Sequence, residues 1–420
     1  KSAASDDFNF FPPEGHVSLP IKSYTYLYFG GARRGQESTW NMSSNIYKIS
    51  FIVDDNDVNV DFISEIKLSG GQFPQLQSSA GFYVSAENCL FVWGGLNLSC
   101  FSMSNELYIV KLNDNKGVVE IIQPPGGISV RELRGEIPSG RCGHTLTHYF
   151  DSCVILHGGV CFPHRNSCVG SSLFKNVTND NSFYMFDFES LFWTKLSVTG
   201  YAPRAYHTAN VMEIRGMKSI VYISGVTKTE SALRRIPLSN VLVLKMNSIK
   251  HFHTEILTFA NAPAVGISYH SVGVIGPYIF VVGGLDEDNL QGRCSVSILN
   301  KDTFLCENVQ FDRYFRSAGH SVCTLSDDCL MICGGMNLQY FVFSSKQMVP
   351  SPCDFDTECK IIESVETSPI SWIQCEGACK RWLHQFCVGV LDIDMSRKNF
   401  ICTTCSKTSR DKKRKSLVQN

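Results

Sequence analysis

Six short apolar runs that end in glycine constrain this chain more than any other feature. Five of the six end in a glycine pair, and in the fourth run Ser224 takes the place of the first glycine. The last glycines are Gly31, Gly95, Gly159, Gly225, Gly284 and Gly335, at intervals of 64, 64, 66, 59 and 51 residues. A recurring period of this kind indicates a repeat architecture. Glycine at a strand end permits positive φ and close approach of a neighbouring backbone.

Each of the six units carries the same strand signals around its glycines. A histidine precedes the glycines in five units, as His16, His144, His207, His270 and His320. An alternating segment such as Asn105–Val110 follows the glycines, and in the third unit an outer segment reaches Trp193. Each unit therefore predicts a four-stranded antiparallel sheet. A sheet this small cannot bury both faces alone, so the units are expected to stack around an axis as propeller blades.

The recurring histidines are expected to be structural. Two units carry the longer pattern Arg-x-x-His, with Arg141 before His144 and Arg204 before His207. Periodic histidines in a β-repeat are poor candidates for catalysis. We therefore expect these histidines and arginines to form hydrogen bonds between strands or blades.

The pattern resembles the kelch repeat over roughly residues 15–345. The resemblance implies an all-β, six-bladed kelch-like β-propeller, which we place at residues 1–345. The units are longer than the ~50 residues of a kelch repeat. The extra length is expected in loops, where propellers make contacts, at residues 31–44, 95–105, 111–140 and 159–181.

Composition narrows the class of protein further. The formal net charge is −1, so nucleic acid or membrane binding would need local patches. No apolar run reaches the 18 or so residues of a membrane helix, and no signal peptide is visible after Lys1. Of the 18 cysteines, 11 precede residue 350, mostly in apolar runs. Such cysteines are typical of buried, reduced thiols, which favours an intracellular compartment.

The last part of the chain carries a different cysteine pattern. The order is four cysteines, one histidine and three cysteines, a spacing of good zinc ligands: Cys353, Cys359, Cys375, Cys379, His384, Cys387, Cys402 and Cys405. This order resembles the PHD finger, placed at residues 353–405. The resemblance implies two structural Zn²⁺ ions with interleaved ligands. The first set is Cys353, Cys359, His384 and Cys387, and the second is Cys375, Cys379, Cys402 and Cys405. Five residues separate Cys353 from Cys359, whereas the family has two.

The segments around these ligands resemble the methyl-lysine site of PHD fingers that bind histone H3 tails. Trp382, two residues before His384, matches the tryptophan of the aromatic cage, and Trp372 matches a second wall. Aromatic faces attract a quaternary ammonium group. Glu376 matches an acidic position that pairs with a histone arginine. The alternative is that both tryptophans belong to the scaffold of the finger.

Two short segments flank the finger. Residues 346–352 form a short linker to the propeller, and residues 406–420 form a basic tail that includes Lys412–Lys415. Such a basic cluster is typical of a nuclear localisation signal or a contact to a polyanion. We therefore expect a nuclear protein.

A kelch-like propeller followed by a PHD finger resembles the family of the second recombination-activating protein and its transposon-encoded relatives. The resemblance implies a non-catalytic subunit that binds a catalytic recombinase or transposase and flanking DNA in a hetero-oligomer. Arg33 and Arg34 occupy a place where that family carries basic residues near DNA. The long acidic hinge of the vertebrate family is absent from the seven-residue linker. No nuclease, phosphate-loop or nucleophile motif is visible, so no enzymatic activity is expected.

Four alternatives remain open at this stage. The chain could be a kelch adaptor that presents substrates to a ubiquitin ligase, or another chromatin scaffold. It could be a copper oxidase with a Tyr/His site on the propeller axis. Finally, Cys161, His164 and Cys168 could hold a metal, with Cys142 or His157 as a fourth ligand.

Overall fold

The computed structural model describes fifteen stretches of the chain. They are residues 13–34, 40–54, 57–97, 102–161, 178–179, 182–198, 202–228, 233–248, 251–286, 295–310, 318–326, 329–335, 339–344, 372–374 and 382–384. The chain divides into two compact units, Lys1–Phe343 and Ser344–Asn420. In the described stretches, no helix is long and apolar enough to cross a membrane.

Each of the first three repeat units forms one sheet, in which most strands pair antiparallel. Unit 1 consists of β1 (Glu14–Lys22), β2 (Thr25–Arg34), β3 (Trp40–Met42), β4 (Ile46–Asp54) and β5 (Asp57–Glu65). Their order in the sheet is β1-β2-β4-β5, and β3 also pairs with β2. Unit 2 consists of β6 (Lys67–Gly70), β7 (Ala80–Val84), β8 (Cys89–Trp93), β11 (Leu107–Asn113) and β12 (Lys116–Ile122). Their order in the sheet is β6-β12-β11-β8-β7. Unit 3 consists of β13 (Arg134–Gly135), β14 (Cys142–Phe150), β15 (Cys153–Cys161), β16 (Thr178–Asn179), β17 (Phe183–Asp187) and β18 (Phe192–Leu196). Their order in the sheet is β13-β18-β17-β15-β14, and β16 also pairs with β15.

The next three units form smaller sheets. Unit 4 has the order β19-β20-β23-β24, from Thr208–Ile214, Met217–Ile223, Asn240–Ser248 and His251–Thr258. Unit 5 has the order β25-β26-β27-β28, from Ser271–Ile275, Tyr278–Val282, Ser295–Asn300 and Leu305–Gln310. Unit 6 has the order β29-β30-β31, from Ser321–Ser326, Cys329–Gly334 and Gln339–Ser344. Two-stranded ribbons follow the glycines of units 2 and 4, as β9 (Leu96–Asn97) with β10 (Ser102–Met103), and β21 (Val226–Lys228) with β22 (Leu233–Arg235).

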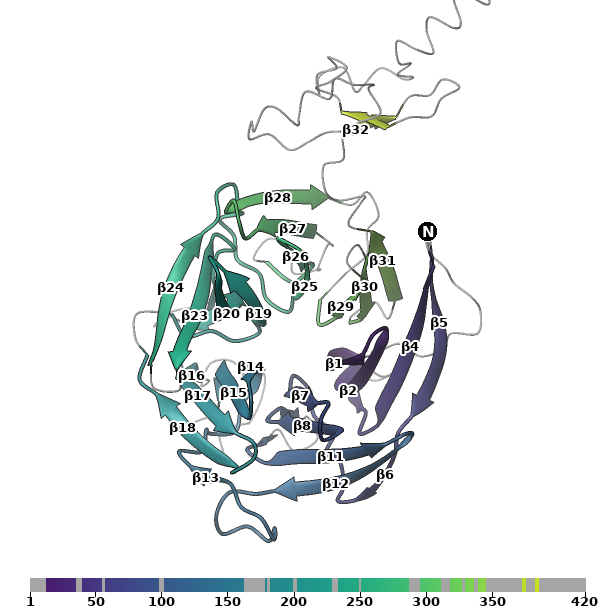
Figure 1. Ribbon diagram of the computed structural model, residues 1–420, viewed down its shortest axis with the longest axis vertical. Coiled ribbons are helices and arrows are strands. Elements are labelled where there is room, and N and C mark those ends of the chain that lie inside the picture. The colour runs from purple at the N-terminus through teal and green to yellow at the C-terminus, as the bar shows by residue number, and fades with distance from the viewer. Residues whose placement is uncertain are drawn as a thin grey trace, which may run out of the picture. The chain divides into compact units, whose positions relative to one another are not determined.

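The sheets of the first compact unit stand around an axis (Figure 1). The innermost strand of each sheet packs against the innermost strands of its neighbours, in the cycle β1, β7, β14, β19, β25, β29 and back to β1. The all-β propeller predicted from the repeats is therefore confirmed. Five sheets have at least the four strands predicted, whereas the sixth has three described strands.

The glycines at the ends of the second strands all have the left-handed conformation that the repeat pattern predicts. Their φ values run from 60° to 104°, and Ser224 has φ 48°. Serine is accommodated because its Oγ lies 2.6 Å from the Ile236 carbonyl oxygen and accepts the Ile267 N–H at 2.8 Å. In the fourth unit, therefore, a serine whose side chain bonds to neighbouring backbone groups takes the place of the first glycine.

Apolar side chains fill the spaces between sheets. All nine residues of β15 are buried, as expected for a strand covered on both faces. Trp93 and Trp193 are fully buried between units 2 and 3, with ring centroids 5.5 Å apart. One prediction was too coarse: residues 111–140 contain the end of β11 and all of β12, so the irregular part begins at Gln123. The backbone of Lys116–Ile122 forms a strand that pairs antiparallel with β11, so this part of the segment is not a loop.

The second compact unit has one described hairpin. Strand β32 (Trp372–Gln374) pairs antiparallel with β33 (Trp382–His384). The register sets Trp372 opposite His384 and Gln374 opposite Trp382.

Candidate functional site

Three of the five recurring histidines, His16, His207 and His270, bond to the neighbouring blade, which confirms the structural role predicted for them. His270 Nε2 lies 3.2 Å from Thr208 Oγ1, and His16 Nε2 lies 2.9 Å from Ser321 Oγ. In both pairs the hydroxyl belongs to the residue that follows the histidine of the preceding unit. Burial lowers the pKa of His16 to about 4 and that of His270 to about 3, so both imidazoles are neutral at physiological pH.

The two predicted arginines are also structural. Arg141 and Arg204 are 0% and 1% exposed, although arginine is rarely buried without partners. Arg141 Nη1 donates to the Gly158 carbonyl oxygen at 2.9 Å, and Arg204 Nη1 donates to the Tyr222 carbonyl oxygen at 3.3 Å. Each guanidinium therefore bonds to the end of the second strand of its own unit, at Gly158 in unit 3 and at Tyr222, just before Ser224, in unit 4.

A closed ring of backbone hydrogen bonds surrounds the axis, one residue from each unit. Each N–H donates to the carbonyl oxygen of the equivalent residue in the preceding unit, over distances of 2.7–3.3 Å. All six residues have left-handed φ, between 52° and 70°. We call them the axial ring: Gly15, Ser78, Gly143, Tyr206, Tyr269 and Gly319. The ring closes from Gly15 to Gly319, which shows that unit 6 occupies a blade position next to unit 1.

Two of the six positions in the axial ring are tyrosines, and their rings stack. The centroids of Tyr206 and Tyr269 are 4.2 Å apart and the planes are 21° from parallel. The Tyr206 hydroxyl lies 3.4 Å from Cys142 Sγ, and its ring occupies the space where a Cβ on Gly143 would project. Burial raises the pKa of the Cys142 thiol to about 11 and also raises the pKa values of both phenols. These groups are protonated at neutral pH, so the cluster offers aromatic faces and neutral hydrogen-bonding groups.

Sequence reasoning missed the axial ring. Its six members are three glycines, two tyrosines and one serine, so no single residue type marks the position. The available signal was positional, because each member immediately precedes the recurring histidine, or Ser79 in unit 2.

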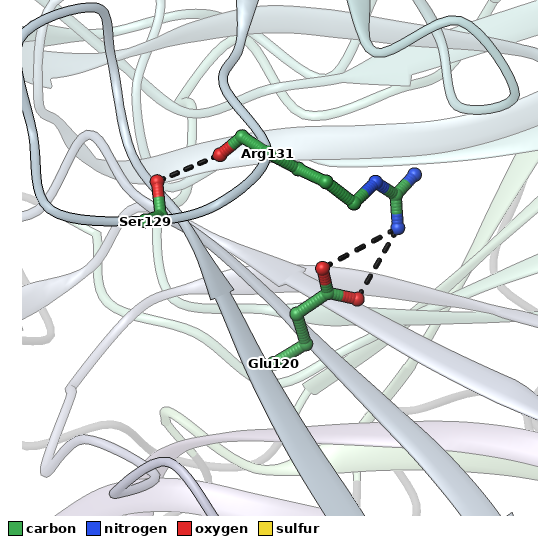
Figure 2. Close-up of polar contacts among 3 residues, drawn as sticks. All are labelled: Glu120, Ser129 and Arg131. Carbon is green, nitrogen blue, oxygen red and sulfur yellow. Dashed lines mark hydrogen bonds and ion pairs between the residues drawn. The ribbon is translucent and has the colours of Figure 1, made fainter.

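An ordered loop projects from the circumference between units 2 and 3. It spans Gln123–Leu133, inside the predicted contact segment 111–140. Figure 2 shows Arg131 Nη1 paired with Glu120 at 3.2 Å, and Ser129 Oγ donating to the Arg131 carbonyl oxygen at 2.7 Å. These bonds hold a turn on which Ile128 and Val130 are 96% and 102% exposed.

Most of the predicted zinc finger lies outside the described residues. This holds for Cys353, Cys359, Cys375, Cys379, Cys387, Cys402 and Cys405, and for Glu376. His384 ends β33, while Trp372 and Trp382 begin β32 and β33. The register therefore brings the backbone of both predicted cage tryptophans and one predicted zinc ligand into a single hairpin. The zinc ligands and the cage remain predictions.

The other predicted sites have partial descriptions. Arg33 and Arg34 end β2, with their backbones opposite Asn41 and Trp40 of β3. Cys161 is buried at the end of β15, and its predicted co-ligands His164 and Cys168 lie outside the described residues. Within the described stretches, no group of three His, Cys, Asp or Glu residues could hold a metal. The eight described propeller cysteines are all buried free thiols, as predicted.

Comparisons with known proteins agree on the fold of the first unit. A family model described as the KLHDC2/KLHL20/DRC7 Kelch-repeats domain matches residues 15–284. A solved structure described as "Structure of YjhT" superimposes with a TM-score of 0.54 at 13% identity. That match covers 79% of this chain and 93% of the other. At this identity the likeness shows the fold alone.

Two curated proteins match a short part of the chain. Lysine-specific demethylase 5B of Gallus gallus is 30% identical over 74 residues, which is 15% of this chain. The JmjC domain-containing histone demethylation protein 1 of Yarrowia lipolytica is 35% identical over 75 residues, which is 16% of this chain. The matched parts are 5% and 13% of those two proteins, so the likeness concerns one small segment of each.

Proposed function

Because the chain belongs to the KLHDC2/KLHL20/DRC7 kelch-repeat family, we propose that its propeller is a non-catalytic scaffold for protein partners. The whole chain would then act as an accessory subunit of a DNA recombinase or transposase. The propeller binds the catalytic subunit and helps to hold flanking DNA, with Arg33 and Arg34 as the first DNA contacts to test. The finger binds the histone H3 tail and keeps the complex on chromatin in the nucleus.

The axial ring carries the scaffold part of this proposal. It pairs one backbone N–H and one carbonyl oxygen between every two neighbouring units and so links the six units around the axis. Burial lowers the pKa values of the five histidines around it, and three of them bond to the neighbouring blade. Burial also raises the pKa values of Cys153 and Cys306 to about 12. Such thiols are weak nucleophiles at neutral pH. What this framework offers a partner is shape, aromatic faces and loops.

The chromatin part rests on different support. The names of both curated relatives refer to demethylation, one of lysine and one of histones. The spacing of the eight zinc ligands favours a PHD finger, and the register of β32 and β33 places Trp372 two pairs from Trp382. We propose that two structural Zn²⁺ ions hold this finger, and that Trp372, Trp382 and Glu376 bind the methylated tail.

A co-purification experiment tests the accessory role. The tagged full chain is expressed in nuclei and recovered under conditions that preserve complexes. We expect a large subunit with a carboxylate metal site, and the recovered complex should cleave or join DNA with Mg²⁺ or Mn²⁺. The chain alone should do neither. Recovery of a cullin would instead establish the ubiquitin-ligase adaptor alternative, and a catalytically active chain would contradict the scaffold proposal.

A further inference from the structure

The tyrosine pair on the axis is maintained at a cost in backbone strain. Tyr206 and Tyr269 have φ values of 54° and 58°, a conformation in which a bulky side chain is an outlier. Each such residue costs on the order of 1–3 kcal/mol. Gly15, Gly143 and Gly319 supply the same backbone bond without that strain. The ring therefore does not require tyrosine, and strain of this kind clusters at binding sites.

An acidic side chain lies beside the tyrosine pair. Glu14 Cγ is 2.5 Å from the point where a Cβ on Gly319 would stand, and Gly319 donates its N–H to the Tyr269 carbonyl oxygen at 2.9 Å. Burial raises the pKa of the Glu14 carboxyl group. In the part of the chain that the structure describes, no Lys, Arg or His lies within ion-pair distance of Glu14. A partly desolvated carboxylate is costly unless a cation pairs with it.

Two charged groups influence the Tyr269 phenol. Burial is the main cause of its raised pKa, the Glu14 carboxylate raises the pKa further, and Arg235 lowers it. Arg235 Nε donates to Ser268 Oγ at 3.4 Å, so it is already engaged by its own neighbourhood. The free charge of the cluster is therefore negative and sits at Glu14, next to an aromatic stack.

We propose that Glu14, Tyr269 and Tyr206 form a recognition site for a lysine or arginine side chain that a protein partner presents to the propeller axis. The carboxylate of Glu14 pairs with the cationic head, while the stacked phenol rings contact the head and its methylene stem. This inference deepens the proposed scaffold role and rests on it, because it specifies which chemistry the axis selects in a partner.

Blocked pentapeptides provide the probe. Acetyl-Gly-Ser-Arg-Ser-Gly-amide is compared with the same peptide carrying norleucine or glutamate at its centre, by saturation-transfer NMR on the full chain. We expect the arginine peptide to bind about tenfold more tightly than the other two, the ratio that ~1.4 kcal/mol of ion-pair and cation–π attraction provides. Glu14→Gln should abolish the difference. Glu120→Gln is the matched control, because Glu120 is an exposed carboxylate that already pairs with Arg131.

Two results would overturn the inference. One is equal binding of the arginine and norleucine peptides. The other is preferential binding of the glutamate peptide that disappears in Arg235→Gln, which would make the axis an anion site. Glu14→Gln keeps the size of the side chain and leaves the axial ring intact, so loss of folding is not expected, and its melting temperature checks this. If the site fails while the catalytic subunit still co-purifies with the chain, only this inference falls.

Discussion

His207 Nε2 lies 3.1 Å from Oγ1 of Thr145, the residue that follows the equivalent histidine of the preceding blade. The same relation joins units 4 and 5, and it recurs between units 6 and 1, where the chain's first strand meets its last sheet. Unit 2 departs from it, because Ser79 and Ala80 stand where the other units have the histidine and its neighbour. At these three junctions the histidine repeat therefore holds adjacent blades together.

Replacement of His207 by alanine should destabilise the propeller. The change removes a buried ring and leaves the Thr145 hydroxyl without this partner, so we expect a loss of about 2–4 kcal/mol in the free energy of unfolding. His253, exposed on β24, is the control, and His253→Ala should change stability by less than about 0.5 kcal/mol. Urea unfolding of both variants measures the difference. Equal effects would show that the inter-blade bond contributes nothing.

Stability should fall as pH drops below about 6.5. Burial lowers the pKa values of His144, His270 and His320 to about 3 in the folded chain, against about 6.5 in the unfolded chain. The unfolded state therefore binds protons that the folded state cannot. Stability is complete above pH 6.5 and declines towards pH 3, by up to ~1.4 kcal/mol per pH unit for each histidine.

Urea midpoints between pH 7.5 and pH 5.5 measure this decline. His270→Gln removes one titrating group, so its midpoint should depend less steeply on pH than that of the unmodified chain. Parallel slopes for the two proteins would contradict a neutral, buried His270.

Alanine substitutions at Gly158 and Gly216 distinguish the cost of a steric collision from the cost of backbone strain. Both have left-handed φ, at 70° and 76°. A Cβ on Gly158 would lie 2.2 Å from the Arg204 carbonyl oxygen, whereas nothing lies within 4 Å of one on Gly216. Gly216→Ala should cost about 1 kcal/mol and Gly158→Ala at least about 3 kcal/mol, measured by thermal unfolding. Similar costs would mean that the blades yield at the glycine pair.

The propeller could be predicted because each unit repeats a local rule. Glycine pairs, the histidine and an alternating strand recur in register, so six weak signals reinforce one another. The axial ring could not be predicted, because backbone hydrogen bonds impose a conformation there and not a residue type. Gly15, Ser78 and Tyr206 all satisfy it. The stacking of Tyr206 on Tyr269 depends on two blades meeting, which spacing along one chain does not reveal.

The purified full chain should contain two Zn²⁺ ions. Cys359 is a predicted ligand of the first ion only, so Cys359→Ser should lower the content to about one ion while the other four-ligand site stays closed. Cys89→Ser is the control, because Cys89 is a buried propeller thiol, and it should leave two ions. Mass spectrometry under native conditions counts the ions. A Cys359→Ser protein that retains two ions would refute the proposed ligand set.

Binding of the full chain to histone H3 tail peptides, with and without trimethylation of lysine 4, tests the proposed function most directly. Calorimetry should show binding of the trimethylated peptide about tenfold tighter, since ~1–2 kcal/mol is the attraction expected from an aromatic cage. Trp382→Ala should remove that preference, whereas Trp193→Phe, a change in the buried propeller core, should preserve it. Equal affinity for the two peptides, unchanged by Trp382→Ala, would contradict the proposal and leave the finger as scaffold.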